Sequence, residues 1–259
     1  MRAEYKAKFP EWTKSDKYFD LCLSNDIDSL FSCKLLEKVK GYKINYFYDF
    51  NCLYKTENAI NEAIAVDIDL IRGKCWGNHV TPFYNPEAAN LNIIDSISHE
   101  NYFDKYAGST LLEIWSYYDI PLPQSEEAKM ILLAIDSFYL GYYSQYFNDI
   151  ISHAHYLNVL EMKEFEEILS RYKPKDFEEV KKKYNLNGKI WIDKDKKLAS
   201  DIRLAELSEL FDLDLTLPDI EFLPYYYFIP QTAKISTIGG KIFSAALVGR
   251  NKIKYSVAV

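Results

Sequence analysis

The stretch LCLSNDIDSLFSCKLLEK, residues 21–38, constrains the fold of this chain more than any other. An apolar run over residues 18–24 is brief and bounded by polar residues, which is typical of a buried parallel strand. Apolar residues then recur at helical spacing and predict a helix over residues 28–39. Asp26 and Asp28 lie at the junction of the two. Because open α/β sheets bind ligands at the carboxyl ends of their strands, both aspartates are candidate site residues.

The same alternation continues along the chain. The next two predicted strands are INYFYDF, residues 44–50, and AIAVDID, residues 63–69, with a helical linker around residues 56–62 between them. Strands that alternate with helices predict a parallel sheet. The third strand also ends in carboxylates, Asp67 and Asp69.

Helical patterns dominate the middle of the chain, where helices are expected over residues 109–118 and 125–147. Asp136 lies among apolar residues within the second of them. A carboxylate buried there needs a partner, because an unpaired buried charge is costly. Two further helices separated by Pro174 are predicted after it.

The predicted architecture is α/β with a small α+β region at the C-terminus. From about residue 187 the pattern changes to one helix, over residues 198–211, and three final strands. We expect a parallel-sheet N-terminal domain over residues 1–147, a helical connector over residues 148–186 and a small α+β lobe over residues 187–259. A chain of 259 residues is long enough for such a division.

Composition limits the partners and the compartment. A formal net charge of −7 argues against a protein that binds long duplex DNA, because phosphate contacts need clustered Lys and Arg. Small phosphorylated substrates and short oligonucleotides remain compatible with it. Four cysteines without CxxC spacing predict reduced thiols and a cytoplasmic protein. No run of 18 apolar residues is present, so neither a membrane helix nor a secretion signal is expected.

The C-terminal region has the opposite charge. Between Leu223 and Val259 there is no Asp or Glu, whereas five Lys and Arg residues, among them Arg250, give a local charge of +5. This asymmetry favours an anion facing the lobe. Gly239 and Gly240 would let the backbone cradle a phosphate, although an ordinary hairpin turn would also use two glycines.

Over residues 18–145 the chain resembles the DHH phosphoesterase superfamily, which includes RecJ-like nucleases, oligoribonucleases, cyclic dinucleotide phosphodiesterases and family II pyrophosphatases. Members begin with a strand, a His, and two Asp at D-x-D spacing before a helix. Asp26 and Asp28 match the pair, while Cys22 stands at the position of the His.

Later parts of the family pattern are matched in order. An Asp at the end of a later strand corresponds to Asp67, and a final Asp in an apolar segment corresponds to Asp136. The Asp-His-His that names the family appears here as Gly77-Asn78-His79, in WGNHVTP. The chain therefore lacks two of the imidazoles and one carboxylate that are typical of the family.

The resemblance implies a metal-dependent hydrolase that cleaves a phosphodiester or phosphoanhydride of a nucleotide or short oligonucleotide in the cleft between its lobes. It implies metal ligation by four carboxylates, Asp26, Asp28, Asp67 and Asp136. His79 would contact the scissile phosphate or a bound water, and Asn78 would stand in for an imidazole through its amide oxygen. The Gly-Gly turn that grips substrate in the family's second domain resembles Gly239-Gly240.

Physical chemistry supports this assignment independently. Two divalent ions about 3.5–4 Å apart can hold both the attacking and the leaving oxygen of a phosphate ester and generate a hydroxide nucleophile. They need several carboxylates from separate chain segments, and hard oxygen ligands suit Mn²⁺ or Mg²⁺. A two-ion site for Mn²⁺ or Mg²⁺ is therefore expected.

Three alternatives stay open at the level of sequence. The missing imidazoles are also compatible with a catalytically silent DHH-like module that binds nucleotides or proteins. The D-x-D of Asp67 and Asp69 is also the form that haloacid dehalogenase-like phosphatases use. Finally, Asp26 and Asp28 alone would be explained by an N-cap and a first-turn acid of a helix, and His79 by packing within a loop.

Overall fold

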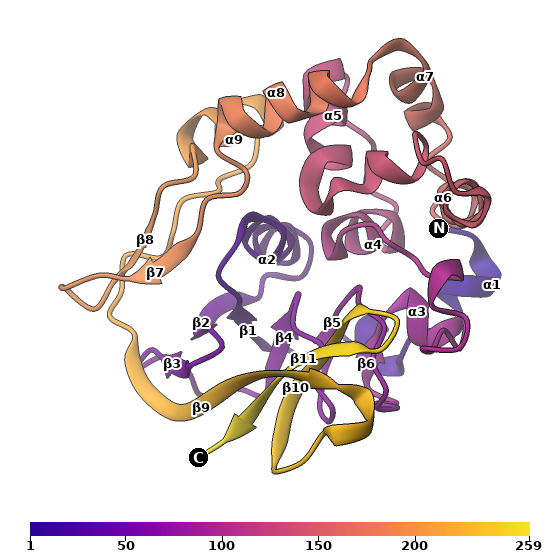
Figure 1. The fold of residues 1–259 in the computed structure, drawn as a ribbon. Coiled ribbons are helices and arrows are strands. Elements are labelled where there is room, and N and C mark those ends of the chain that lie inside the picture. Colours follow the sequence, from indigo (N-terminus) through magenta and orange to yellow (C-terminus); the bar gives the residue numbers. More distant parts are fainter.

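The computed structural model describes residues 1–259 and has the expected α/β class, with a mixed sheet of nine strands (Figure 1). The strand order is β10-β11-β9-β3-β2-β1-β4-β5-β6. The strands are β1 (Asp20–Leu23), β2 (Lys43–Tyr48), β3 (Cys52–Lys55), β4 (Ala63–Val66), β5 (Cys75–Trp76), β6 (Ala88–Ala89), β9 (Leu223–Lys234), β10 (Ile242–Gly249) and β11 (Lys252–Ala258).

Parallel pairing is confined to one half of the sheet. Strand β1 pairs in parallel with β2 and β4, and β4, β5 and β6 continue in parallel. Strands β3, β9, β11 and β10 pair antiparallel. The predicted strands over residues 18–24, 44–50 and 63–69 are confirmed as β1, β2 and β4. The three predicted C-terminal strands are confirmed as β9, β10 and β11.

Nine α-helices and a separate hairpin complete the fold. The helices are α1 (Ala3–Lys6), α2 (Ile27–Lys40), α3 (Leu91–Ile94), α4 (Thr110–Tyr117), α5 (Glu126–Ala134), α6 (Phe147–Val159), α7 (Glu164–Arg171), α8 (Pro174–Tyr184) and α9 (Leu204–Phe211). The hairpin consists of β7 (Ile190–Ile192) and β8 (Leu198–Ser200), and short 3₁₀ segments are η1 (Glu11–Lys14), η2 (Tyr102–Asp104), η3 (Ile135–Gly141) and η4 (Ile235–Thr237). No helix combines the length and the hydrophobicity needed to cross a bilayer.

Four sequence predictions of helix were wrong. The single helix expected before Pro174 is divided into α6 and α7, because the chain turns at Glu161, where φ is 56°. Residues 56–62 form a turn instead of a helical linker, because β3 pairs with β2 and the backbone N–H of Thr56 donates to the Asn45 carbonyl at 3.0 Å. The helix expected over 125–147 ends at Ala134, because the backbone is left-handed at Asp136 and Ser137. The helix expected over 198–211 begins only at Leu204, because residues 198–200 pair with β7.

The two faces of the parallel strands are buried against different partners. Leu21 and Leu23 of β1 belong to a core of 52 residues that packs beneath α2 and α4. Cys22, which points to the opposite face because side chains alternate along a strand, packs with Phe228 of β9 in a smaller cluster. The C-terminal strands therefore cover the second face of the N-terminal sheet.

Backbone hydrogen bonds draw the last strands toward the carboxyl edge of the parallel strands. Within β10, the N–H of Ala245 donates to the Asp69 carbonyl at 2.9 Å, and the N–H of Leu247 donates to the Val80 carbonyl at 2.8 Å. The sheet consequently curls, and residues of the predicted lobe share one sheet with residues of the predicted N-terminal domain. The boundaries at residues 147 and 186 stay a prediction.

Candidate metal centre

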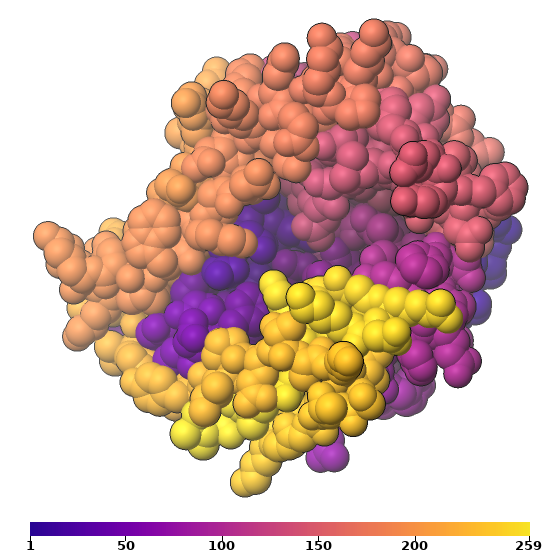
Figure 2. Space-filling model, in the orientation of Figure 1, coloured from indigo at the N-terminus to yellow at the C-terminus, as the bar shows by residue number.

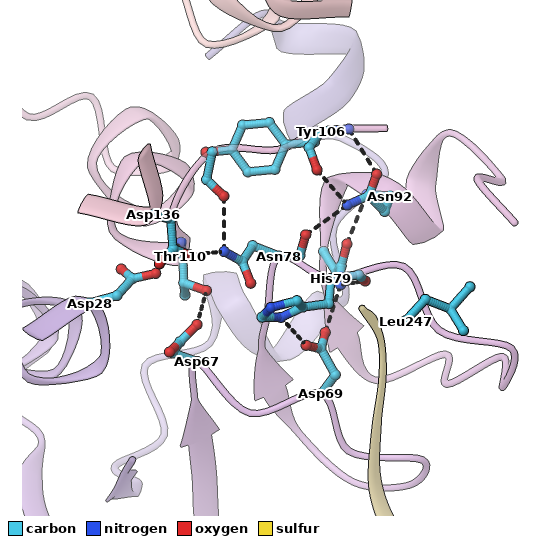
Figure 3. A network of polar contacts seen from close by, with 12 residues as sticks. Asp28, Asp67, Asp69, Asn78, His79, Asn92, Tyr106, Thr110, Asp136 and Leu247 are labelled. Atoms are coloured by element: carbon cyan, nitrogen blue, oxygen red, sulfur yellow. Dashed lines mark hydrogen bonds and ion pairs between the residues drawn. The ribbon is translucent and has the colours of Figure 1, made fainter. Parts of the chain in front are cut away.

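Three carboxylates from distant parts of the chain meet at the carboxyl edge of the parallel strands. Asp28, Asp67 and Asp136 each place one carboxylate oxygen within 4.8 Å of the others (Figure 3). They come from the first turn of α2, the end of β4 and the break after α5. Since β1 and β4 are adjacent parallel strands, their carboxyl ends open at the same edge. Three carboxylates this close together could hold a hard cation.

The carboxylate of Asp28, a residue of α2, lies at the N-terminus of a second helix, α4, and accepts hydrogen bonds from it. Its two carboxylate oxygens accept from the backbone N–H groups of Thr110 and Leu111, both at 2.8 Å, at the N-terminus of α4. Only 2% of the residue is exposed. The unpaired N–H groups and the dipole of α4 stabilise the negative charge, which offsets part of the cost of its burial.

The other two carboxylates are held by unusual backbone. Asp67 has φ of 58° and Asp136 has φ of 54°, and Ser137 follows with φ of 58°. Left-handed backbone is uncommon for residues other than glycine, although Asp adopts it more readily than most. The hydroxyl of Thr110 donates to Asp67 at 3.0 Å. Backbone strain of this kind concentrates at functional sites, where surrounding contacts maintain it.

Burial and mutual repulsion act together on the cluster. Burial raises the pKa of Asp28 well above its usual range, and the charges of Asp136 and Asp26 raise it further. Burial likewise raises the pKa of Asp67, with Asp28 as the largest neighbouring charge. Asp136 is the most exposed of the three, and desolvation of its carboxylate, followed by the charge of Asp26, also raises its pKa. A cation at this point would relieve both effects, since opposite charge favours ionised carboxylates.

Asn78 joins the cluster through its amide. The Nδ2 donates to the Asp136 carboxylate at 2.6 Å and to the Gly108 carbonyl at 2.9 Å. Its Oδ1 is buried and has no hydrogen-bond partner. Figure 3 shows this amide between Asp136 and His79. A buried acceptor without a donor is uncommon, and a cation beside the carboxylates would satisfy it.

His79 is paired with a carboxylate of its own. Its Nδ1 lies 2.9 Å from Oδ2 of Asp69, and Asp69 also accepts from Asn90 at 2.8 Å. Burial alone would lower the pKa of His79, but the hydrogen bond and the charge of Asp69 raise it above the usual value. The imidazole is 43% exposed and lines the cleft described below. Asp69 therefore orients a histidine that is accessible from solvent.

Gly77 has no room for a side chain. A Cβ at this position would overlap the carboxylate of Asp69. The carboxylate of Asp69, which follows the neighbouring strand β4, thus fills the space that a side chain at position 77 would occupy.

A cleft of about 450 Å³ opens beside the cluster. It is lined by Asp67, Asp69 and His79 together with Gln231 and Lys254 from the C-terminal strands. Figure 2 shows this face hollowed between the C-terminal strands and the orange helical segment, with N-terminal residues at the bottom. An anionic ligand entering here would meet both the carboxylate cluster and a lysine.

Asp26 borders the same cleft but lies outside the group of three. Its side chain caps α2 by accepting from the N–H of Ser29 at 3.4 Å, and it lies 3.5 Å from Nζ of Lys189. Cys22 is buried in the apolar cluster behind β1, where burial raises the pKa of its thiol. It is not among the residues that converge.

The residues expected to bind substrate in the C-terminal lobe do not line the cleft. Gly239 and Gly240 lie in the turn before β10, and Gly240 has φ of 93° with the side chain of Val257 where a Cβ would be. The turn therefore requires this glycine for its own conformation. The Nε of Arg250 donates to the His99 carbonyl at 3.2 Å.

Several site residues escaped the sequence patterns. Thr110 contacts both Asp28 and Asp67, and Asn90 supports Asp69 and the His79 carbonyl. One signal was present, because four asparagines between residues 78 and 92 exceed what a loop needs. All of them are buried: Asn78, Asn85, Asn90 and Asn92.

No family model, curated protein or solved structure matches the chain in the three comparisons made. The chemistry of the carboxylate cluster and its cleft therefore carries the functional inference.

Proposed function

We propose that the protein is a metal-dependent phosphoesterase that hydrolyses a phosphodiester or phosphoanhydride of a nucleotide or short oligonucleotide. The observation that carries the proposal is the convergence of Asp28, Asp67 and Asp136 within 4.8 Å at the edge of a cleft. Asn78, whose Nδ2 donates to Asp136 and whose Oδ1 has no partner, would offer a fourth oxygen. Such an all-oxygen donor set suits Mn²⁺ or Mg²⁺.

We assign the metal ligands as follows. Asp28, Asp67, Asp136 and Asn78 hold the cation, and bound Mn²⁺ or Mg²⁺ supplies Lewis acidity and a water of lowered pKa. The remaining carboxylates that line the cleft, Asp26 and Asp69, are those available to a second ion. Each of the proposed ligands comes from the carboxyl edge of the sheet or from a segment packed against it.

His79 would act on the phosphate directly. Asp69 fixes the orientation of its imidazole through Nδ1 and raises its pKa, which leaves Nε2 to donate to a phosphoryl oxygen or a bound water. Lys254, which lines the same cleft, would attract the anionic substrate. The acidic character of the whole chain restricts this attraction to small substrates.

The resemblance to DHH phosphoesterases adds to the proposal. Asp69 occupies the space beside Gly77, so a carboxylate is available where the family's leading Asp is replaced. In this reading residues 1–147 form the DHH-like domain and residues 187–259 a substrate-binding lobe, with Gly239, Gly240 and Arg250 at its outer edge. The protein would act on nucleotides in the cytoplasm.

The proposal is tested by replacing one carboxylate. Asp67→Asn is expected to abolish Mn²⁺-dependent hydrolysis of bis(p-nitrophenyl) phosphate and of a short oligonucleotide, because it removes a charged ligand with little change in shape. Asp195→Asn, at an exposed turn between β7 and β8, is the matched control and should retain wild-type rates. Equal rates for Asp67→Asn and the wild type would exclude the proposed chemistry.

A catalytically silent nucleotide-binding or protein-interaction module is the second candidate. The observation in its favour is that no imidazole belongs to the group of three carboxylates and that Cys22 is buried elsewhere. Calorimetric titration separates the two candidates. Absence of Mn²⁺ and Mg²⁺ binding at millimolar concentration would favour the silent module, whereas binding that depends on Asp67 favours the enzyme.

A further inference from the structure

Phe50 places an aromatic ring on the wall of the same cleft. It lies in the turn between β2 and β3 and lines the cleft together with Asp67, His79 and Lys254. The residue is 37% exposed, whereas the other aromatic residue of the lining, Tyr255, is buried. One face of an apolar ring is thus available to a ligand that also reaches the carboxylate cluster.

The backbone of Phe50 is unusual for so bulky a residue. Its φ is 72°, in the left-handed region where glycine is the ordinary occupant. The turn is held by Asp49, whose Oδ1 accepts from the N–H groups of Asn51 at 2.8 Å and Cys52 at 2.7 Å. The neighbouring strand adds the N–H of Phe228, which donates to the Asn51 carbonyl at 2.7 Å. These contacts maintain a conformation that the side chain itself disfavours.

The ring is also supported from behind. Its centroid lies 5.0 Å from that of Tyr48, which is fully buried. The Tyr48 hydroxyl is anchored to Ser256 at 2.5 Å and to Ser244 at 3.3 Å. The two ring planes are inclined by 50°, so Phe50 packs at an angle against a fixed residue. A ligand that stacks on its exposed surface would cost little side-chain entropy in the protein.

The cleft thus combines an aromatic platform with groups that select phosphate. The side chain of Gln231, which also lines the cleft, accepts from Tyr255 through Oε1 at 2.6 Å, and its amide nitrogen could donate to the polar edge of a base. We propose that Phe50 is the base-stacking residue of the site and that the ligand is a nucleotide whose heterocycle lies on its ring. The position of the phosphate in this inference rests on the proposed function. Stacking on an aromatic side chain tolerates any base, since every base has a π face.

Two probes that differ only by the base test the inference. Adenosine 5′-monophosphate and ribose 5-phosphate are titrated calorimetrically into the full chain at one fixed concentration of MnCl₂. We expect the wild type to bind the nucleotide about ten-fold more tightly or better, because base–aromatic stacking is of that size. Phe50→Gly should lose this preference and keep the affinity for ribose 5-phosphate, since glycine accepts the backbone conformation.

Two further variants make the result specific. Phe50→Tyr keeps a ring and should keep the preference, and Phe147→Ala, at a residue 74% exposed and outside the cleft, should behave as the wild type. If Phe50→Gly does not fold, Phe50→Asn replaces it, because Asn also tolerates the left-handed region. Equal wild-type affinity for the two probes, no binding of either, or an unchanged preference in Phe50→Gly would overturn the inference.

Hydrolysis measured in parallel distinguishes the two proposals. A Phe50-dependent preference for the nucleotide without hydrolysis of any phosphoester would support the base site and refute the enzyme. Mn²⁺-dependent hydrolysis of inorganic pyrophosphate without such a preference would support the enzyme and refute the base site.

Discussion

Asn78 donates from Nδ2 to the Asp136 carboxylate at 2.6 Å while its own Oδ1 remains buried without a donor. One end of the amide thus holds a carboxylate of the cluster in place, and the other end presents a free acceptor. Under the proposed function, Asn78 would both support a carboxylate of the metal site and offer an oxygen to the cation.

Replacing Asn78 should therefore weaken metal binding without removing a carboxylate. Asn78→Ala is expected to reduce Mn²⁺ affinity by roughly 10–100-fold, the usual effect of removing a group that orients a ligand. Calorimetric titration measures it, with Asn148→Ala as control because Asn148 makes only an exposed hydrogen bond to Asp104. An affinity equal to that of the wild type would show that the amide has no part in the site.

Metal should stabilise the wild type and not Asp67→Asn. Without metal, Asp67→Asn is expected to raise Tm, because burial and the charge of Asp28 raise the pKa of Asp67 and destabilise its ionised form. With Mn²⁺ at a hundred times its Kd, the wild type should gain about 2.7 kcal/mol of unfolding free energy. Thermal unfolding with and without MnCl₂ measures both effects.

Asp28→Asn provides the contrast. Its carboxylate accepts from two backbone N–H groups of α4, and an amide can accept from one of them at most while its NH₂ faces the other. The metal-free variant should therefore melt below Asp67→Asn. Identical melting of the two variants would contradict the capping role inferred for Asp28.

The stability of the protein should depend on pH through Glu113. This residue is fully buried in α4, its Oε1 accepts from the N–H of Leu91 at 3.0 Å, and its Oε2 has no partner. Burial raises its pKa well above the ordinary value. The unfolded state then loses this proton at lower pH than the folded state, so stability falls as pH rises from about 4.3 toward the folded pKa.

Glu113→Gln should remove this dependence, since glutamine keeps the acceptor without the charge. Its Tm is expected to exceed that of the wild type at pH 8, and the difference should shrink as pH falls toward about 4. Thermal unfolding of the two proteins across that range measures it. A difference that grew at low pH would mean that the folded pKa is depressed, contrary to the structure.

The four thiols should resist modification in the folded protein. All are buried, and burial raises the pKa of each. Because the thiolate is the reactive form, we expect a colorimetric disulfide reagent at pH 7.5 to react with none of them rapidly, and with all four after unfolding in urea. Rapid reaction of a single thiol that Mn²⁺ blocks would instead place Cys22 at the metal site.

Local sequence patterns predicted much of the fold. The apolar run of β1 and the helical spacing of α2 are properties of neighbouring residues, so the junction at Asp26 and Asp28 could be predicted from the sequence. The α/β class followed from the same alternation. That the strands of residues 223–259 would join the N-terminal sheet by pairing β9 with β3 is a long-range event that no local pattern reports.

The site shows the same division. Sequence by itself determined which apolar segments carry acidic residues, because Asp67 and Asp136 interrupt apolar runs. Only the tertiary structure decided that these carboxylates meet, that Asp69 fills the space beside Gly77 and that Phe50 lines the cleft in a left-handed conformation. The reason is physical. Helices and strands arise from interactions between residues near in sequence, whereas this site is held by contacts between segments up to about two hundred residues apart, which form only when the whole chain packs.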